Sequence, residues 1–395
     1  MIYIDATELG WRTYTESWIN AKFGSDEEIK TFHRDLFEKW LPKILKFKEL
    51  NCFEPVKVSE FCAVVSLCSL YDALGKSEPA FKKENLGADY LSVAEKMFVF
   101  SLIWSVGASV DEVGRKKISS CISDIDAIFP PANTAFDYYV DISKNDVVGW
   151  DTKVPSWRPL KNMTFHDMII PTVDTVRNSY IADTLVNLKK NVMLVGATGT
   201  GKTVLVQSLL KDLPETHSQL AINFSAATTS SAVQDIIEGP MEKRSKDKLG
   251  PLGGKNLVIF IDDFNMPKKT SSESPFQPPL ELIRLWIDYQ GWYDRQKCSW
   301  KFILDSQLIV AMGHPGGGRN QICGRTQSRF SVVNLTFPAD SQIVKIFDSI
   351  LQSKFVDFDN EIKQLSGSIA AATLNTYKAV VAEFLSTPEK FHYLL

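Results

Sequence analysis

The chain has 395 residues, of which 44% are hydrophobic and 23% are charged. This composition is typical of a globular protein and excludes a disordered or collagen-like chain. At roughly 100 to 200 residues per domain, the length corresponds to about two to four domains. Lys and Arg total 44 against 47 Asp and Glu, so the net charge is −3. Because no excess of positive charge would attract nucleic acid or an anionic membrane, we expect neither as a partner.

The first 130 residues show the spacing of amphipathic helices. Between Glu27 and Lys48, apolar residues recur at steps of three and four, which is the period of one helix face. The uncharged stretch 97–110 is too short to cross a bilayer and predicts a buried helix. Pro130 and Pro131 then end the pattern, and we place a domain boundary there. Three further segments share this spacing: Phe61–Leu74, Tyr90–Val106 and Val113–Ile125.

Cysteine and histidine usage gives no sign of a metal site. The six cysteines form no CxxC pair, and the five histidines occur singly, so neither a zinc site nor a disulfide framework has its usual spacing. The N-terminus carries acidic residues where a secretory signal carries basic ones. We therefore expect reduced thiols and a cytoplasmic compartment.

From residue 191, short apolar runs alternate with helical segments. Strands that are covered by helices on both faces are apolar throughout, so this part predicts an α/β fold with a parallel sheet flanked by helices. It follows the α-helical domain and an extended, Trp- and Pro-containing connection over 131–190, and the helical pattern returns from Pro338. The predicted strands are Val192–Val195, Leu220–Phe224, Leu257–Ile261, Gln307–Met312 and Ser331–Phe337.

One motif in the α/β part is a phosphate-binding loop. Residues 196–203 read GATGTGKT and match G-x-x-x-x-G-K-[ST] at every fixed position, after a predicted strand and before a predicted helix. In such a loop backbone N–H groups surround a β-phosphate, Lys202 reaches the β and γ oxygens, and the Thr203 hydroxyl ligates Mg²⁺. The motif predicts a site for ATP or ADP with Mg²⁺. Its backbone is supplied by Gly196, Ala197, Thr198, Gly199, Thr200 and Gly201.

The strand Leu257–Ile261 ends in two carboxylates, Asp262 and Asp263. Asp262 is in the right position to hold Mg²⁺ opposite Thr203. Asp263 is the candidate for orienting an attacking water, but it is one methylene shorter than the Glu of many ATPases, on the order of 1.5 Å, and such a displacement can lower a rate about a hundredfold. We therefore expect slow hydrolysis. The alternative is that the two carboxylates only close the turn after the strand.

Longer stretches of the chain resemble the third AAA+ module of axonemal dynein heavy chains, and Tyr3–Trp11 with the helices that follow resembles the lid of the second module. The resemblance implies a piece of a larger ring, with a lid (1–130), a connection containing the adenine-side loop (131–190), a P-loop core (191–338) and the start of a second lid (339–395). The stretches that carry it are Ile170–Arg177, Ile261–Pro267, Gln277–Arg284, Trp292–Arg295 and Gly316–Asn320.

The resemblance also implies roles for single residues. Ile170, Pro171 and Thr172 would meet the adenine, and Lys202, Thr203, Asp262 and Asp263 would form the phosphate and Mg²⁺ site. Gly313 stands where such modules usually carry the sensor Asn. Arg325 would be the arginine finger, with Arg329 as the less favoured candidate, and it would act in trans on the preceding module.

As a whole, the resemblance implies a regulatory ATP- or ADP-binding module of a microtubule-based motor of the cilium or flagellum. The partners would be neighbouring AAA+ modules and, through the parent assembly, dynein intermediate and light chains and microtubules. The location would be the cytoplasm, the cytoskeleton and the axoneme. One alternative is a structural fragment with a vestigial nucleotide site, and another is a self-contained AAA+ ATPase that assembles into homo-rings.

Four features have ordinary structural interpretations. The charged run Lys243–Lys248 is expected to be a solvated loop, and His314 an exposed loop residue without a role. Pro275, where the family usually has glycine, requires a local difference in its loop. The aromatic residues Trp286, Trp292 and Tyr293 are expected to pack in the core or the lid.

Overall fold

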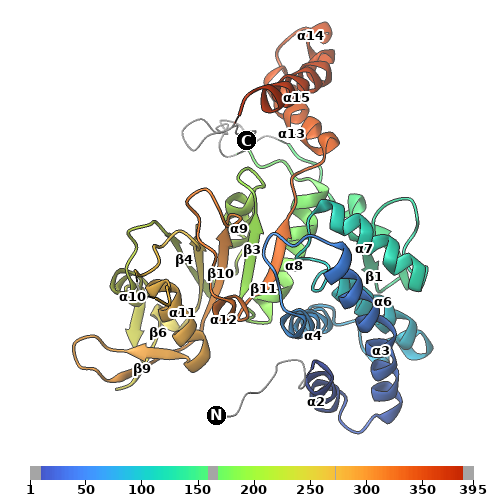
Figure 1. Ribbon diagram of the computed structural model, residues 1–395. Coiled ribbons are helices and arrows are strands. Elements are labelled where there is room, and N and C mark those ends of the chain that lie inside the picture. Colours follow the sequence, from blue (N-terminus) through green and yellow to red (C-terminus); the bar gives the residue numbers. More distant parts are fainter. Residues whose placement is uncertain (1–9, 159–167, 272, 386–395) are drawn as a thin grey trace.

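The computed structural model describes residues 10–158, 168–271 and 273–385. Most of the Tyr3–Trp11 stretch and the C-terminal Lys390–Leu395 segment therefore lie outside the described residues. The described part comprises an N-terminal helical lid, a P-loop core and a C-terminal group of helices (Figure 1).

The N-terminal lid consists of α2 to α7. Side-chain caps begin α3 and α7, since Asp26 accepts from the Ile29 N–H at 3.2 Å and Asp111 accepts from the Gly114 N–H at 2.7 Å. The four predicted helices are confirmed, although α6 ends at Ile103 and the chain continues to Val110 as a buried turn. None of the helices in the described ranges is long and apolar enough to span a membrane. The helices are Arg12–Phe23 (α2), Glu27–Asn51 (α3), Glu60–Ser77 (α4), Lys83–Leu86 (α5), Tyr90–Ile103 (α6) and Glu112–Ile125 (α7).

A β-hairpin follows the lid helices where only an extended connection was expected. Strands β1 (Tyr138–Asp141) and β2 (Asp146–Gly149) pair antiparallel, and a 3₁₀ turn, Trp150–Lys153, comes next. Trp150 is fully buried, with its ring 5.3 Å from that of Tyr180 and 6.2 Å from that of Phe100. The hairpin segment thus joins the lid to the first helix of the core.

The core is a five-stranded, fully parallel sheet in the order β11-β3-β10-β7-β4. All five predicted strands are present, and the α/β prediction is confirmed. Because the strands run parallel, their carboxyl ends lie at one edge, where loops to the helices begin. The strands are Val192–Gly196 (β3), His217–Asn223 (β4), Asn256–Asp262 (β7), Ser306–Met312 (β10) and Ser331–Leu335 (β11); the helices are Val173–Asn187 (α8), Lys202–Lys211 (α9), Ser230–Glu238 (α10), Pro278–Tyr289 (α11) and Gly324–Gln327 (α12).

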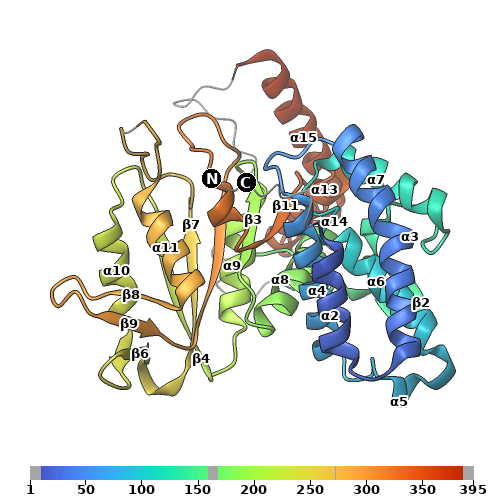
Figure 2. The same ribbon diagram turned by 60° about the horizontal axis from the view of Figure 1, so that its bottom comes forward.

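A second, four-stranded sheet at the side of the core was not predicted (Figure 2). Trp292 of this sheet and Trp286 of α11 are buried as expected, with ring centroids 5.4 Å apart. The expectation for Tyr293 was wrong, since 58% of it is exposed: successive side chains of a strand point to opposite faces, and Tyr293 points away from the face on which Trp292 is buried. The run 243–248 is exposed as expected and forms the turn of a hairpin. The strands are Met241–Lys243 (β5), Lys248–Pro251 (β6), Gly291–Tyr293 (β8) and Trp300–Ile303 (β9).

The C-terminal helices are α13 (Asp340–Lys354), α14 (Asn360–Gln364) and α15 (Ser366–Glu383). They stand away from the sheet at the top of Figure 1, and α13 packs mainly against α15. The large hydrophobic core runs without interruption from Trp11 in the lid to Leu335 in β11 and contains no residue of these three helices.

Candidate nucleotide-binding site

The phosphate loop connects β3 to α9 at the carboxyl edge of the sheet. Gly199 and Gly201 have φ angles of +84° and +76°, a left-handed conformation that glycine adopts without steric cost. α9 begins at Lys202, so the free N–H groups of its first turn lie at the loop. The glycines of the motif are therefore required by the backbone conformation that the loop adopts.

Lys202 folds back over the loop that precedes it. Its Nζ donates to the carbonyl oxygens of Gly196 at 2.9 Å and Ala197 at 2.8 Å. Burial lowers the pKa of the ammonium group, as does the charge of Arg319, while the carboxylates of Asp262 and Asp263 oppose that shift. The lysine is thus held at the loop, near the carboxylates of Asp262 and Asp263.

Thr203 and Asp262 meet directly, although 59 positions separate them in the chain. The Thr203 hydroxyl donates to Asp262 Oδ2 at 2.5 Å, and Asp262 Oδ1 accepts the N–H of Asp263 at 2.9 Å. The turn-closing alternative therefore accounts for one oxygen of Asp262, and the other faces the phosphate loop. A hydroxyl and a carboxylate are the oxygen ligands that Mg²⁺ prefers.

Asp263 follows β7 with φ of +50°, a left-handed conformation that Asp adopts more readily than most residues. The Met266 N–H donates to its carbonyl at 2.9 Å, which closes a turn directly after the strand. Its carboxylate Oδ1 lies 3.7 Å from Nη2 of Arg319. The second carboxylate is therefore paired with a cation that the sequence analysis did not select.

Three amides, also not selected, join the loops at this edge of the sheet. Asn265 is fully buried and its Nδ2 donates to the Gly313 carbonyl at 2.8 Å. Gln277 and Asn320 both donate to the Pro267 carbonyl, at 2.6 and 3.0 Å. All three lie in stretches that the family resemblance singled out, but nothing in the local spacing indicates their partners.

His314 was expected to be exposed, and this was wrong: it is half-buried. Burial lowers the pKa of its imidazole, and the charges of Lys202 and Arg319 lower it further. The residue follows β10, the strand between β3 and β7, and this central position removes it from solvent.

The two candidate finger residues lie on and after α12, and both are exposed. Arg329 Nε is paired with Asp288 Oδ1 at 2.5 Å, whereas Arg325 forms no ion pair within the described ranges. Among the described residues, neither Arg325 nor Arg329 forms a hydrogen bond or ion pair with the phosphate loop. Gln327, on the same helix, donates to the Lys57 carbonyl of the N-terminal lid at 2.8 Å.

The candidate adenine-side residues precede α8. Ile170 is buried, and Thr172 caps the helix by accepting the Thr175 N–H at 3.2 Å. Pro171 lies between them and is partly exposed. α8 packs against α9 and β3, the two elements that flank the phosphate loop. The candidate adenine-side loop therefore lies at the N-terminal end of a helix next to the phosphate site.

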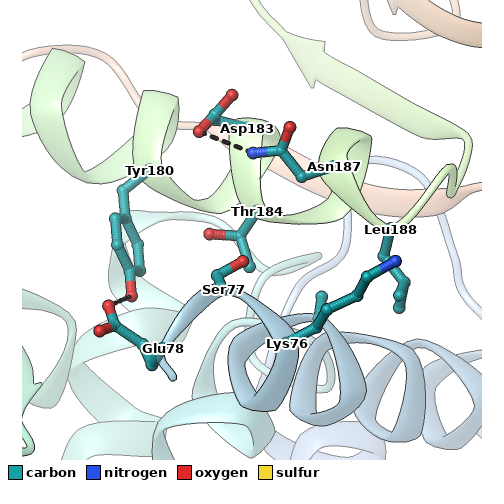
Figure 3. Close-up of a pocket in the computed structure, with 9 residues that line it drawn as sticks. Lys76, Ser77, Glu78, Tyr180, Asp183, Thr184, Asn187 and Leu188 are labelled. Carbon is teal, nitrogen blue, oxygen red and sulfur yellow. Dashed lines mark hydrogen bonds between the residues drawn. The ribbon is translucent and has the colours of Figure 1, made fainter. Parts of the chain in front are cut away.

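A cavity of about 420 Å³ lies elsewhere, between α4 of the lid and α8 of the core (Figure 3). The Tyr180 hydroxyl donates to Glu78 at 3.2 Å across it, and Asn187 donates to Asp183 on one wall. None of the phosphate-loop residues lines this cavity. It is therefore a gap in the contact between lid and core, separate from the candidate site.

The parallel sheet, the phosphate loop and the Thr203–Asp262 contact together define a P-loop domain of the AAA+ class preceded by a helical lid. A family model described as "P-loop containing dynein motor region" matches residues 157–338, and one described as "Dynein heavy chain AAA lid domain" matches residues 33–152. The chain therefore belongs to the dynein heavy chain family.

Similar proteins include Dynein axonemal heavy chain 2 of Mus musculus, 47% identical over 396 residues, and its Homo sapiens counterpart, 46% identical. The Dynein-1-beta heavy chain, flagellar inner arm I1 complex, of Chlamydomonas reinhardtii is 40% identical over 428 residues. Each match covers 100% of this chain and 9% of the relative. The chain thus spans a small part of the length of the curated relatives that it matches.

Proposed function

We propose that the chain is a regulatory AAA+ module of an axonemal dynein heavy chain that binds ATP or ADP with Mg²⁺. The direct bond between Thr203 and Asp262 is the observation that carries the proposal. Two residues from separate motifs meet there, next to a lysine held by the phosphate loop. We assign 1–130 to the lid of the second module, 131–190 to the connection, 191–338 to the core of the third module and 339–395 to its own lid.

The residues at this edge of the sheet fit a Mg-nucleotide. An added Cβ at Gly199 or Gly201 would have no atom within 4 Å, so open space borders the loop. Lys202 would hold phosphate oxygens, and Thr203 with Asp262 would hold Mg²⁺, which neutralises phosphate charge when bound. The loop at Ile170, Pro171 and Thr172 would contact the adenine.

Hydrolysis by this chain is expected to be slow. Asp263 is shorter than the Glu that orients water in many ATPases, and it is partnered by Arg319. Gly313 carries no side chain that could act as a sensor. Arg325 is exposed without an ionic partner in the described ranges, which suits a finger that acts in trans on the preceding module. A site that binds nucleotide tightly and turns over slowly suits regulation of neighbouring modules.

Within the parent heavy chain, the module would contribute to microtubule-based movement in the axoneme of a cilium or flagellum. The relatives named axonemal or flagellar support this location. Neighbouring AAA+ modules would be the direct partners, and intermediate chains, light chains and microtubules would be reached through the whole assembly.

A titration with a fluorescent nucleotide analogue tests the proposal. Lys202→Ala removes the cation at the phosphate loop, and Lys211→Ala is the matched control at the exposed opposite end of the same helix. We expect Mg²⁺-dependent binding by the wild type and by Lys211→Ala, and a loss of about tenfold or more in affinity for Lys202→Ala, since a charged hydrogen bond contributes about 1.5–3 kcal/mol.

Thermal unfolding tests nucleotide binding by a second, independent measurement. A ligand at about 100 times its Kd stabilises the native state by about 2.7 kcal/mol, so Mg-ATP should raise the Tm of the wild type and not that of Lys202→Ala. Equal affinities in all three proteins, with no Tm shift, would replace the proposal with the structural-fragment alternative. Rapid turnover by a hexamer would favour the homo-ring instead.

A further inference from the structure

A tight turn after β10 positions a cation that no motif accounts for. The turn spans Gly316–Arg319, whose end residues exchange two backbone hydrogen bonds of 2.9 and 3.0 Å. Its three glycines all have positive φ angles, +121°, +56° and +88°. Residues with a side chain would be strained in this conformation. The glycines thus allow a reversal that brings Arg319 back to the end of the strand.

Gly313, at the end of β10, makes room for this arginine. A Cβ added at Gly313 would lie 2.4 Å from Nε and 2.6 Å from Cδ of Arg319, closer than real atoms approach. The arginine side chain therefore lies directly across the position where the family resemblance places the sensor Asn. Because β10 runs between β3 and β7, this position lies between the strand that leads into the phosphate loop and the strand that leads into Asp262 and Asp263.

The hydrogen-bond donors of the Arg319 guanidinium are only partly satisfied by neighbouring groups. Its Nε is buried and has no hydrogen-bond partner in the described part of the chain, and its ion pair with Asp263 is long, at 3.7 Å. Its positive charge acts on Lys202, whose pKa it helps to lower. Buried donors without partners are rare in native proteins and call for a specific explanation.

We propose that Arg319 is a specificity-determining residue that binds the terminal phosphate of a nucleoside triphosphate in cis, so that the site distinguishes triphosphates from diphosphates. The inference rests on the proposed nucleotide site. A guanidinium matches phosphate oxygens with paired N–H donors. Arg319 lies on the Asp263 side of the site, whereas Lys202 and the loop N–H groups serve the phosphates next to α9.

The proposal gives the Arg319–Asp263 pair a function. When a terminal phosphate is present, it competes with the Asp263 carboxylate for the guanidinium, which releases Asp263 to accept a hydrogen bond from water. When only a diphosphate is present, the arginine remains with Asp263. The long 3.7 Å pair is a weak contact of the kind that a doubly charged phosphate can replace.

The test compares the affinities of each variant for ADP and for a non-hydrolysable ATP analogue, both fluorescent and both with Mg²⁺. Arg319→Ala should weaken the triphosphate about 10- to 100-fold, the range expected for charged hydrogen bonds, and change the affinity for ADP less than about threefold. Arg319→Lys, which keeps the charge and loses the paired donors, should fall between. Arg295→Ala, which removes an exposed pair with Asp235 of α10, is the matched control and should change neither affinity.

Gly313→Ala provides a second route that leaves Arg319 in place. The added methyl would force the guanidinium aside, so this variant should lose the same selectivity while its melting temperature confirms that it is folded. Equal weakening of ADP and triphosphate by Arg319→Ala, or unchanged selectivity in both variants, would overturn the inference and leave the nucleotide site intact. If the wild type bound neither nucleotide, the proposed function would fail first, and this inference with it.

Discussion

The N-terminal lid and the C-terminal helices are attached to the same P-loop core in different ways. The N-terminal lid shares one continuous hydrophobic core with the sheet, from Trp11 to Leu335, and lies against the sheet in both views (Figures 1 and 2). The C-terminal helices bury a few residues among themselves, including Ile343 and Leu374, and none of them belongs to that core. The N-terminal lid is thus integrated with the sheet, whereas the C-terminal helices are only tethered to it.

The N-terminal lid is integrated because it completes the sheet. β11 is an edge strand that pairs only with β3, and its free edge would otherwise expose backbone donors and acceptors. The lid supplies the missing partners: the Asn334 N–H donates to the Ala108 carbonyl at 2.8 Å, and Arg115 Nη2 donates to the Asn334 carbonyl at 2.5 Å. Hydrogen bonds to the backbone of β11 and burial of apolar side chains therefore both hold the lid at this contact.

The C-terminal helices begin a few residues beyond the same strand but make little contact with the core. The Gln342 side chain accepts the Asp174 N–H of α8 at 3.3 Å, and apolar side chains such as Val356, Phe358 and Phe384 are 51% to 61% exposed. Stability follows the number of buried contacts. We therefore expect the N-terminal lid and the sheet to unfold as one unit, and the C-terminal helices to open at lower cost.

The largest expected effect comes from Trp104→Ala in the N-terminal lid. Trp104 is 2% exposed, its ring is 5.5 Å from that of Phe136, and the guanidinium of Arg115 lies 5.5 Å from its centroid. Removing so large a buried side chain should cost about 3–5 kcal/mol. Because lid and sheet share one core, denaturant unfolding should shift for both together, and nucleotide binding should be lost at the same midpoint.

Leu374→Ala in α15 is the matched change on the other side of the comparison. Leu374 is 6% exposed, and its loss should speed hydrogen exchange in α13 and α15 while the amides of β3 and β11 keep their protection. Hydrogen exchange measured by mass spectrometry reads both regions. The comparison would be wrong if Trp104→Ala loosened only the lid helices, or if Leu374→Ala loosened the sheet.

The second effect is the pH dependence of the N-terminal lid, through His33. The ring is fully buried, with Nδ1 2.8 Å from the Ile29 carbonyl and Nε2 3.0 Å from the Tyr71 hydroxyl. Burial lowers its pKa from 6.5 to about 4, so the native state holds the neutral ring and the unfolded chain takes up the proton first. The resulting stability is present above pH 6.5 and is lost as the pH falls towards 4.

The expected loss between pH 7 and pH 5 is about 2 kcal/mol. Chemical unfolding at a series of pH values measures it, with His33→Phe as the variant that should flatten the curve in this range. The described residues of α13, α14 and α15 contain no histidine, so mild acid should weaken the integrated part and spare the tethered part. A wild-type curve as flat as that of His33→Phe would mean that the ring does not carry this dependence.

The parts of the fold that could be predicted from the sequence depend on repeated local patterns. The five strands are continuous apolar runs, and the amphipathic helices repeat apolar residues at a fixed period. Both patterns can be read from the sequence because burial of the apolar side chains requires them. The second sheet was missed because β5 and β8 have three residues each, too few to show alternation. The β1–β2 hairpin was missed because its strands are also short and only partly buried.

In the candidate site, too, some contacts could be predicted from the sequence and others could not. The closeness of Thr203 and Asp262 was predictable, since each belongs to a motif with a fixed place at the end of a parallel strand. The contact of Arg319 with Gly313 was not, because it depends on the direction of a three-glycine turn. His314 was expected to be exposed because the chain after β10 reads as a loop, but it follows the central strand of the sheet and is half-buried.

The smallest expected effect concerns the side chain that fixes the lid to the edge strand. Asn334 is 3% exposed in β11, and its Nδ2 donates to the Val110 carbonyl of the lid at 3.0 Å. Asn334→Ala removes this bond and keeps the two backbone contacts, so the expected loss is about 1 kcal/mol, the usual net contribution of one hydrogen bond. Asn360→Ala, at an exposed position on α14, is the control and should have no measurable effect on unfolding of the sheet.

The value of Asn334→Ala lies in separating the two causes of lid attachment. If apolar burial holds the lid, the variant should lose about 1 kcal/mol with an unchanged denaturant m-value, because the same surface is still buried until both parts unfold together. If the edge-strand bonds hold it, the lid should detach first, and the m-value of the main transition should fall. The shared core from Trp11 to Leu335 supports the first outcome, and a lower m-value would show instead that pairing along β11 controls attachment.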